Sequence, residues 1–90
     1  MRALVVEDHE EMRDALVASL AARGHDVVAC GDLEAGWAAW SAGPFPLVFL
    51  DRCLPDGDGL DLCRRLRATP DGRTAVVLVL TAYADSGAPE

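Results

Sequence analysis

Acidic and hydroxyl side chains stand where the apolar runs of this sequence end, and their types suit phosphoryl chemistry. They are Glu7, Asp8, Asp51 and Thr81. Carboxylates that lie close together raise one another's pKa values by repulsion, whereas Mg²⁺ prefers oxygen ligands and commonly bridges carboxylates to phosphate. A nearby hydroxyl such as that of Thr81 could donate a hydrogen bond to a phosphoryl oxygen. The combination predicts phosphoryl transfer to a carboxylate nucleophile, with Mg²⁺ as the cofactor.

Asp51 poses the sharpest question, because it ends the apolar run "PLVFLD" and is followed at once by a turn-forming stretch. An unpaired carboxylate costs several kcal/mol when it enters an apolar core. Asp51 is therefore either the first residue of a surface turn or a group held at the rim of a buried strand for chemical work. The predicted strands and helices around Asp51 distinguish between these alternatives.

The sequence alternates between short apolar runs and segments of helical character. Strands covered on both faces are predicted at 3–6, 25–30, 46–51 and 75–80. Helices are predicted at 8–24, 32–43 and 58–69. This β-α-β-α-β-α-β order with short loops requires crossover connections, so we expect an α/β fold with a parallel sheet and helices on both faces.

Local signals support the predicted helices. Asp8 and Glu11 have the spacing of a capping pair for the first helix, and Asp32 stands at the cap position of the second. Side chains that repeat at helical spacing predict the inward faces of the helices. These are Met12, Leu16 and Leu20 in the first helix, Leu33, Trp37 and Trp40 in the second, and Leu62 and Leu66 in the third.

The predicted sheet would bring the acids together. Ligands of an open α/β sheet bind beyond the carboxyl ends of the strands, where the strand order reverses. If the first and third strands are neighbours, Glu7, Asp8 and Asp51 converge within a few ångströms. A structural role remains the alternative, since Glu7 and Asp8 could simply complement the dipole of the first helix, worth about 0.3–1 kcal/mol.

Three blocks of the sequence resemble the receiver domain of bacterial response regulators, the phosphoacceptor half of two-component signalling. They are "LVVED", "LVFLDRCLPDGDGLDLCRRLR" and "VVLVLTAY", in this order and at compatible spacing. The resemblance implies a flavodoxin-like doubly wound parallel sheet of order 2-1-3-4, with the fifth strand and last helices missing. It implies one receiver domain over residues 1–90, incomplete at its C-terminus. It also implies a domain that takes phosphate from a histidine kinase or phosphotransfer protein and is not a turnover enzyme.

The resemblance assigns a role to each site residue. Asp51 would be the phosphorylated residue, Thr81 the switch hydroxyl, and Ala82 the small residue that leaves the pocket open. The implied Mg²⁺ ligands are Glu7, Asp8, Asp51 and the backbone carbonyl of Cys53.

The sequence departs from the receiver pattern by lacking the final elements, the switch aromatic of the fifth strand and the lysine that follows it. Receivers carry a lysine after a fifth strand, whereas this sequence contains no lysine. We therefore expect phosphorylation to be poorly coupled to a conformational switch. Because the fifth strand is missing, we also expect the fourth strand, at 75–80, to form an exposed edge through which the chain self-associates.

Composition excludes several classes of partner and compartment. Ninety residues make one small domain, and a net charge of −7 argues against direct nucleic-acid binding by this segment. The three cysteines show no C-x-x-C spacing, so neither a disulfide framework nor a zinc site is indicated, and reduced thiols fit the cytoplasm. The first apolar run is too short for a signal peptide or a membrane span.

Other functions compete with that of a phosphoacceptor. A degenerate receiver could act only as a protein-interaction module. A phosphatase with an aspartate nucleophile needs a second acid two residues later, where this sequence has Cys53. A calcium loop that starts at Asp56 fails at Leu60, where an acidic residue is required.

Overall fold

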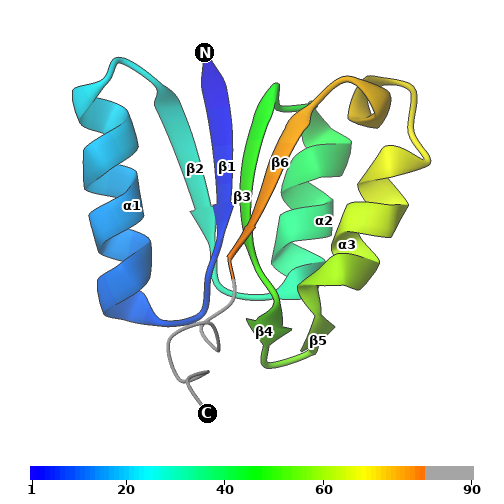
Figure 1. Cartoon of the computed structure of the whole chain (residues 1–90), viewed down its shortest axis with the longest axis horizontal. Helices are drawn as coiled ribbons and strands as arrows, with labels where there is room; N and C mark the ends of the chain where they lie inside the picture. The colour runs from blue at the N-terminus through cyan, green and yellow to red at the C-terminus, as the bar shows by residue number, and fades with distance from the viewer. Residues whose placement is uncertain (81–90) are drawn as a thin grey trace, which may run out of the picture.

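Four five-residue strands of mainly aliphatic residues form the central sheet of the protein (Figure 1). They are β1 (Arg2–Val6), β2 (Asp26–Cys30), β3 (Leu47–Asp51) and β6 (Val76–Leu80). All pairings are parallel and the order is β2-β1-β3-β6, which confirms the predicted order 2-1-3-4. The coordinates are a computed structural model that describes residues 1–80.

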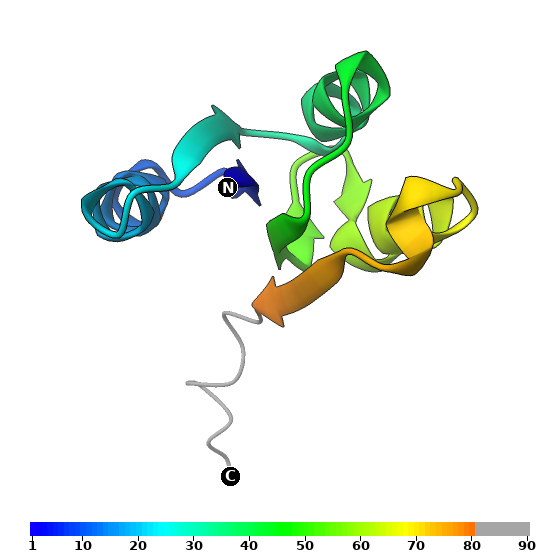
Figure 2. The same ribbon diagram turned by 90° about the horizontal axis from the view of Figure 1, so that it is seen from above.

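Helices cover both faces of the sheet, as the crossover connections require (Figure 2). One face carries α1 (Glu10–Ala22), which packs on β1 and β2. The other face carries α2 (Leu33–Ala42) and α3 (Gly59–Arg67), which also pack against each other. Among residues 1–80, no helix combines the length and the apolar character needed to cross a membrane.

The core consists of two apolar layers separated by the sheet. Successive residues of β1 alternate between them, so that residues 3–6 are all fully buried. The layer beneath α1 contains Ala3, Val5 and Leu20. The layer beneath α2 and α3 contains Leu4, Val6, Leu33, Trp40, Phe45, Val48, Leu50, Leu62, Leu66 and Ala75. Burial on both faces explains why these strands read as continuous apolar runs.

The segment after β3 forms a small hairpin, where the sequence predicted only a loop. Its strands are β4 (Cys53–Leu54) and β5 (Gly57–Asp58), which pair antiparallel across a two-residue connection. A single 3₁₀ turn, η1 (Asp71–Arg73), connects α3 to β6. The hairpin lies at the carboxyl edge of the sheet, directly beside the end of β3 (Figure 1).

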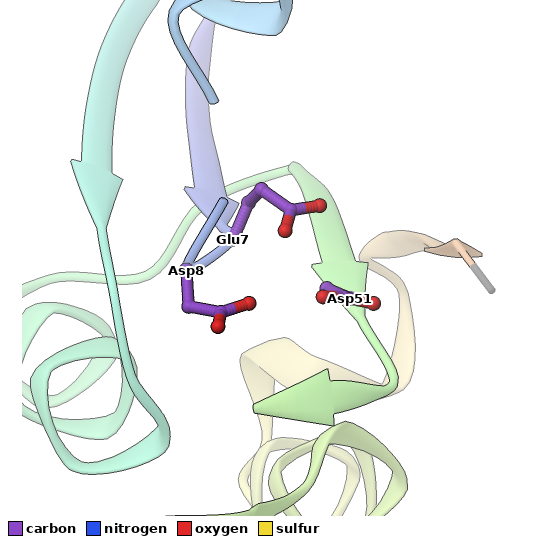
Figure 3. Close-up of side chains that lie close together, drawn as sticks. All are labelled: Glu7, Asp8 and Asp51. Atoms are coloured by element: carbon purple, nitrogen blue, oxygen red, sulfur yellow. The ribbon is translucent and has the colours of Figure 1, made fainter. Parts of the chain in front are cut away.

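The start of α1 differs from the prediction. The N-cap is His9, which makes no side-chain capping bond, so the expected Asp8–Glu11 capping pair is wrong. The main chain instead turns at residues 7–9, which directs the Asp8 side chain toward the end of β3 (Figure 3). Met12 is predicted on the inner face of α1 but is 51% exposed. The helix instead packs on the core layer of Ala3 and Val5 through Leu16 and Leu20.

The predicted contacts of α2 and α3 are confirmed. Asp32 caps α2 by accepting a hydrogen bond from the backbone N–H of Ala35 at 2.7 Å. Leu62 and Leu66 of α3 are fully buried on its inner face. Three arginines of α3 bind partners within the chain: Arg64 pairs with Asp61, Arg65 pairs with Glu34, and Arg67 donates to the carbonyls of Gly72 and Ala75.

The edge strand β6 carries exposed apolar side chains. Val76, Leu78 and Val79 are 55%, 45% and 37% exposed. Within residues 1–80, β3 is the only strand that pairs with β6. The other edge of β6 therefore presents main-chain groups without a strand partner in this part of the chain.

Candidate functional site

Three carboxylates meet at the carboxyl edge of the sheet (Figure 3). Glu7 and Asp8 follow β1, and Asp51 is the last residue of β3. Because β1 and β3 are parallel neighbours, their ends lie side by side. Each of the three residues offers one carboxylate oxygen, and these oxygens lie within 4.8 Å of one another. We call Glu7, Asp8 and Asp51 the acid cluster.

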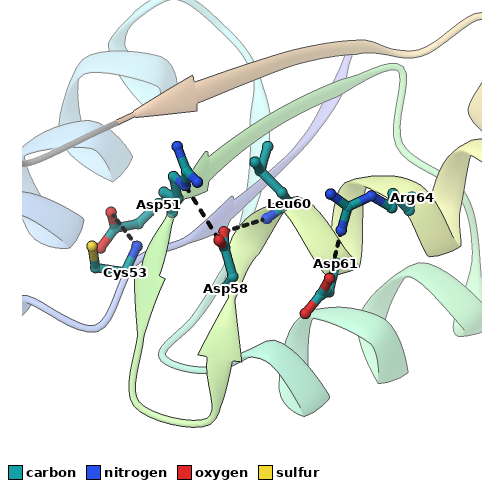
Figure 4. A network of polar contacts seen from close by, with 7 residues as sticks. Asp51, Cys53, Asp58, Leu60, Asp61 and Arg64 are labelled. Carbon is teal, nitrogen blue, oxygen red and sulfur yellow. Dashed lines mark hydrogen bonds and ion pairs between the residues drawn. The ribbon is translucent and has the colours of Figure 1, made fainter.

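Burial and hydrogen bonds fix two members of the acid cluster and leave the third open to solvent. Glu7 and Asp51 are 5% and 4% exposed, whereas Asp8 is exposed. Glu7 Oε2 accepts a hydrogen bond from the backbone N–H of His9 at 3.0 Å. Asp51 Oδ1 accepts one from the backbone N–H of Cys53 at 3.2 Å (Figure 4). The cluster thus combines two oriented carboxylates with one at the solvent boundary.

Main-chain hydrogen bonds hold the frame around the cluster. The N–H of Glu7 donates to the carbonyl of Cys30 at the end of β2, at 2.9 Å. The carbonyl of Glu7 accepts a hydrogen bond from the Arg13 guanidinium at 3.1 Å. On the other side, the N–H of Arg52 donates to the carbonyl of Leu80 at 3.0 Å. The ends of all four strands of the main sheet therefore contribute to the position of the acids.

The electrostatics of the cluster favour a cation. Burial raises the pKa of Glu7 above its ordinary value of 4.5, and the adjacent Asp51 and Asp8 carboxylates raise it further. The hydrogen bond from the His9 N–H lowers this pKa and offsets only part of the effect. Oxygen is the only donor element of the three side chains, and hard cations such as Mg²⁺ prefer oxygen ligands. The residues present therefore fit Mg²⁺.

We predict a pH-dependent stability difference between the wild-type protein and Glu7→Gln without divalent cations. The folded state raises the pKa of Glu7, so its stabilising contribution is complete below about pH 4.5 and disappears as the pH rises through the raised value. Glu7→Gln carries no charge at this position. Urea unfolding in a chelating buffer should therefore show the variant gaining stability relative to wild type as the pH rises from 4.5 through the raised pKa of Glu7. A pH-independent difference would contradict the raised pKa.

The structure describes only some of the other predicted site residues. Thr81 and Ala82 lie outside residues 1–80. Cys53 begins β4 and is exposed. Its carbonyl as a metal ligand stays a prediction.

Two acids of the hairpin make contacts beside the site that were not predicted. Asp58 caps α3 by accepting a hydrogen bond from the N–H of Leu60 at 2.9 Å, and it pairs with Arg52 at 3.3 Å (Figure 4). Its place directly before a helix was a usable N-cap signal. Asp56 binds the N-terminus of α2, and these hydrogen bonds lower its pKa. No local signal indicates this contact, because its partners lie 22 and 23 residues earlier in the chain.

Comparisons with known sequences find response regulators. The sequence matches the response regulator receiver domain family over residues 3–89. Protein RcaC from Microchaete diplosiphon is 38% identical over 82 residues, which cover 91% of this chain and 12% of that protein. The transcriptional regulatory protein CseB from Streptomyces avermitilis is 39% identical over 83 residues, which cover 92% of this chain and 34% of that protein. The chain thus spans about a third or less of the length of these relatives.

Solved structures share the fold described above. The response regulator protein TrrA from Thermotoga maritima, in complex with Mg²⁺-BeF, is 28% identical with a TM-score of 0.84. That similarity covers 93% of this chain and 71% of the TrrA chain. The non-phosphorylated receiver domain of HemR from Leptospira biflexa is 31% identical with a TM-score of 0.83, and the similarity covers 92% and 65% of the two chains.

Proposed function

Because this chain belongs to the response regulator receiver domain family, we propose that it is a phosphoacceptor of a two-component system. Asp51 receives a phosphoryl group from a histidine kinase or phosphotransfer protein, and the chain is not a turnover enzyme. The observation that carries the proposal is the acid cluster, in which three carboxylate oxygens lie within 4.8 Å at the carboxyl edge of a parallel sheet. This edge is where open α/β sheets bind their ligands.

In the proposed reaction, a carboxylate oxygen of Asp51 attacks the phosphorus atom of a phosphohistidine. A P–O bond forms, the P–N bond breaks, and the imidazole leaves with a proton from solvent. Asp51 is suited to this role because β3 and the N–H of Cys53 hold its carboxylate in one orientation. Thr81 would donate a hydrogen bond to the phosphoryl group, and Ala82 would leave room for it.

Mg²⁺ would be held by the acid cluster and the backbone carbonyl of Cys53. When bound, the ion neutralises charge on the phosphoryl oxygens. The protein's own contribution is to concentrate three negative charges at one edge and to keep Glu7 and Asp51 oriented by backbone N–H groups. The TrrA complex with Mg²⁺-BeF supports this assignment by similarity.

Incubation with acetyl phosphate tests the proposed function. We expect the wild-type chain to gain one phosphoryl group in the presence of Mg²⁺ and none in a chelating buffer, as measured by intact-protein mass spectrometry. A protein that binds Mg²⁺ but acquires no phosphoryl group would favour the interaction-module alternative.

We predict that Asp8→Asn weakens Mg²⁺ binding more than Glu7→Gln. Asp8 is exposed and can reach a hydrated cation, whereas Glu7 is buried and already accepts the His9 N–H. Mg²⁺ titration by calorimetry at constant ionic strength should show a loss of about tenfold or more for Asp8→Asn. Equal losses in the two variants would contradict Asp8 as the direct ligand.

We also predict that the 90-residue chain associates with a second copy through the outer edge of β6. Two copies of this edge can pair antiparallel about a two-fold axis and satisfy each other's main-chain groups. Sedimentation velocity at several concentrations should show a reversible dimer. Leu78→Lys should weaken it, because Leu78 is 45% exposed on the edge strand. A wild-type chain that stays monomeric at every concentration would exclude this association.

A further inference from the structure

We propose that Asp56, at the tip of the β4–β5 hairpin, positions the Mg²⁺-binding loop by anchoring it to the N-terminus of α2. The inference rests on the proposed function, because it concerns the same metal site. Asp56 is a positioning residue: it acts through the Cys53 carbonyl and does not itself touch the metal or the phosphoryl group.

Both carboxylate oxygens of Asp56 bind α2. Oδ1 accepts a hydrogen bond from the N–H of Leu33 at 2.8 Å, and Oδ2 accepts one from the N–H of Glu34 at 3.1 Å. The next N–H, of Ala35, is capped by Asp32 from within the same segment. The first three backbone donors of the helix are thus all bound by carboxylates, two of them by the hairpin. A negative charge at this end of a helix is also favoured by the helix dipole.

Apolar contacts support the same attachment. Leu54 packs against the core layer that contains Leu33. Gly57 has φ of 151°, and a Cβ at this position would lie 2.8 Å from Leu33 Cδ1. The hairpin therefore lies against the first residue of α2 so closely that a side chain at Gly57 would require the Leu33 side chain to move. The position of the hairpin is set by α2 as well as by the end of β3.

The anchor completes a closed set of contacts around the acid cluster. One end of the hairpin is tied to the cluster, because the Cys53 N–H donates to Asp51. Its tip is tied to α2 by Asp56. The segment before α2 is tied back to the cluster, because the carbonyl of Cys30 accepts the N–H of Glu7. The Cys53 carbonyl lies in the main chain between the two hairpin anchors.

Loss of the Asp56 anchor should make the position of the Cys53 carbonyl less fixed, with a smaller effect on the carboxylates of Glu7 and Asp51. The strand ends hold the main chain at Glu7 and Asp51 independently of the hairpin tip, whereas β4 and β5 have only two residues each. Residues that orient metal ligands typically change metal affinity by 10–100-fold when they are replaced. We expect an effect at the lower end of this range, since one ligand among several is loosened.

Asp32 provides the matched control. Asp32→Ala and Asp56→Ala each remove one negative charge and one capping side chain from the same helix end, but only Asp56 connects that end to the hairpin. A role in helix stability or in the overall charge would therefore affect both variants alike. Asp56→Asn, which keeps one acceptor oxygen, should bind Mg²⁺ with intermediate affinity and guards against a loss of folding in Asp56→Ala.

The test is a Mg²⁺ titration of the 90-residue chain by calorimetry, with thermal melts of the metal-free proteins followed by circular dichroism. We expect Asp56→Ala to raise the Mg²⁺ dissociation constant about tenfold, and Asp32→Ala to lower the melting temperature while binding Mg²⁺ within about twofold of wild type. Wild-type affinity in Asp56→Ala, or an equal loss in Asp32→Ala, would overturn the positioning role alone. A wild-type chain that binds no Mg²⁺ would overturn the proposed function as well.

Discussion

Asp51→Asn should reduce acyl phosphate formation from acetyl phosphate to below about one hundredth of the wild-type level. The amide is nearly isosteric with the carboxylate and keeps an oxygen that can accept the Cys53 N–H, but it has no anionic oxygen to attack phosphorus. Borohydride trapping of the acyl phosphate, followed by peptide mass spectrometry, should place the modification of the wild-type protein on Asp51.

Asp61→Asn is the control for this experiment. Asp61 is an exposed aspartate of α3 that pairs with Arg64, and it is no part of the acid cluster. This variant should be phosphorylated like wild type. Modification that persists in Asp51→Asn, or that maps to Glu7 or Asp8, would refute Asp51 as the acceptor.

Gly59→Ala should lower the free energy of unfolding by about 3 kcal/mol or more, at the upper end of what overpacking costs. A Cβ at Gly59 would collide with the main-chain carbonyl oxygen of Asp51 and lie 3.2 Å from Cα of Arg52. These atoms are backbone and cannot turn aside as a side chain can. A small domain has about 5 kcal/mol of stability at the low end of the usual range, so the variant should keep about 2 kcal/mol or less and unfold at a much lower urea concentration than wild type.

Gly24→Ala separates this collision from the general effect of replacing a glycine. Gly24 has φ of 88°, and a Cβ there would meet nothing within 4 Å, so alanine should cost only about 1–2 kcal/mol of backbone strain. Urea unfolding of both variants in a chelating buffer measures the difference. A Gly59→Ala protein as stable as Gly24→Ala would show that the turn after β3 can rearrange.

The parallel sheet could be predicted from periodicity and order along the chain, whereas the strand order that brings the acids together was implied by the resemblance to receiver domains. Continuous aliphatic runs such as that of β1 indicate strands buried on both faces, and alternation with helices requires parallel pairing. Once β1 and β3 are parallel neighbours, residues that directly follow them must lie at one edge. The order of the strands is therefore enough to place Glu7, Asp8 and Asp51 together, as the structure confirms.

Contacts between distant segments could not be predicted, because no local pattern encodes which side chain will face which backbone group. Asp32 and Asp58 follow local capping rules, but Asp56 binds α2 across 22 and 23 residues of chain, and Arg65 pairs with Glu34 across 31. The start of α1 was also predicted wrongly. The turn at residues 7–9 directs Asp8 to the acid cluster, so that His9 and not Asp8 is the N-cap. The sequence by itself determined the strands, their parallel pairing and the chemistry at the strand ends, and its resemblance to receiver domains implied the strand order. Only tertiary packing decided how the hairpin is anchored beside them, since that depends on the position of α2 relative to β3.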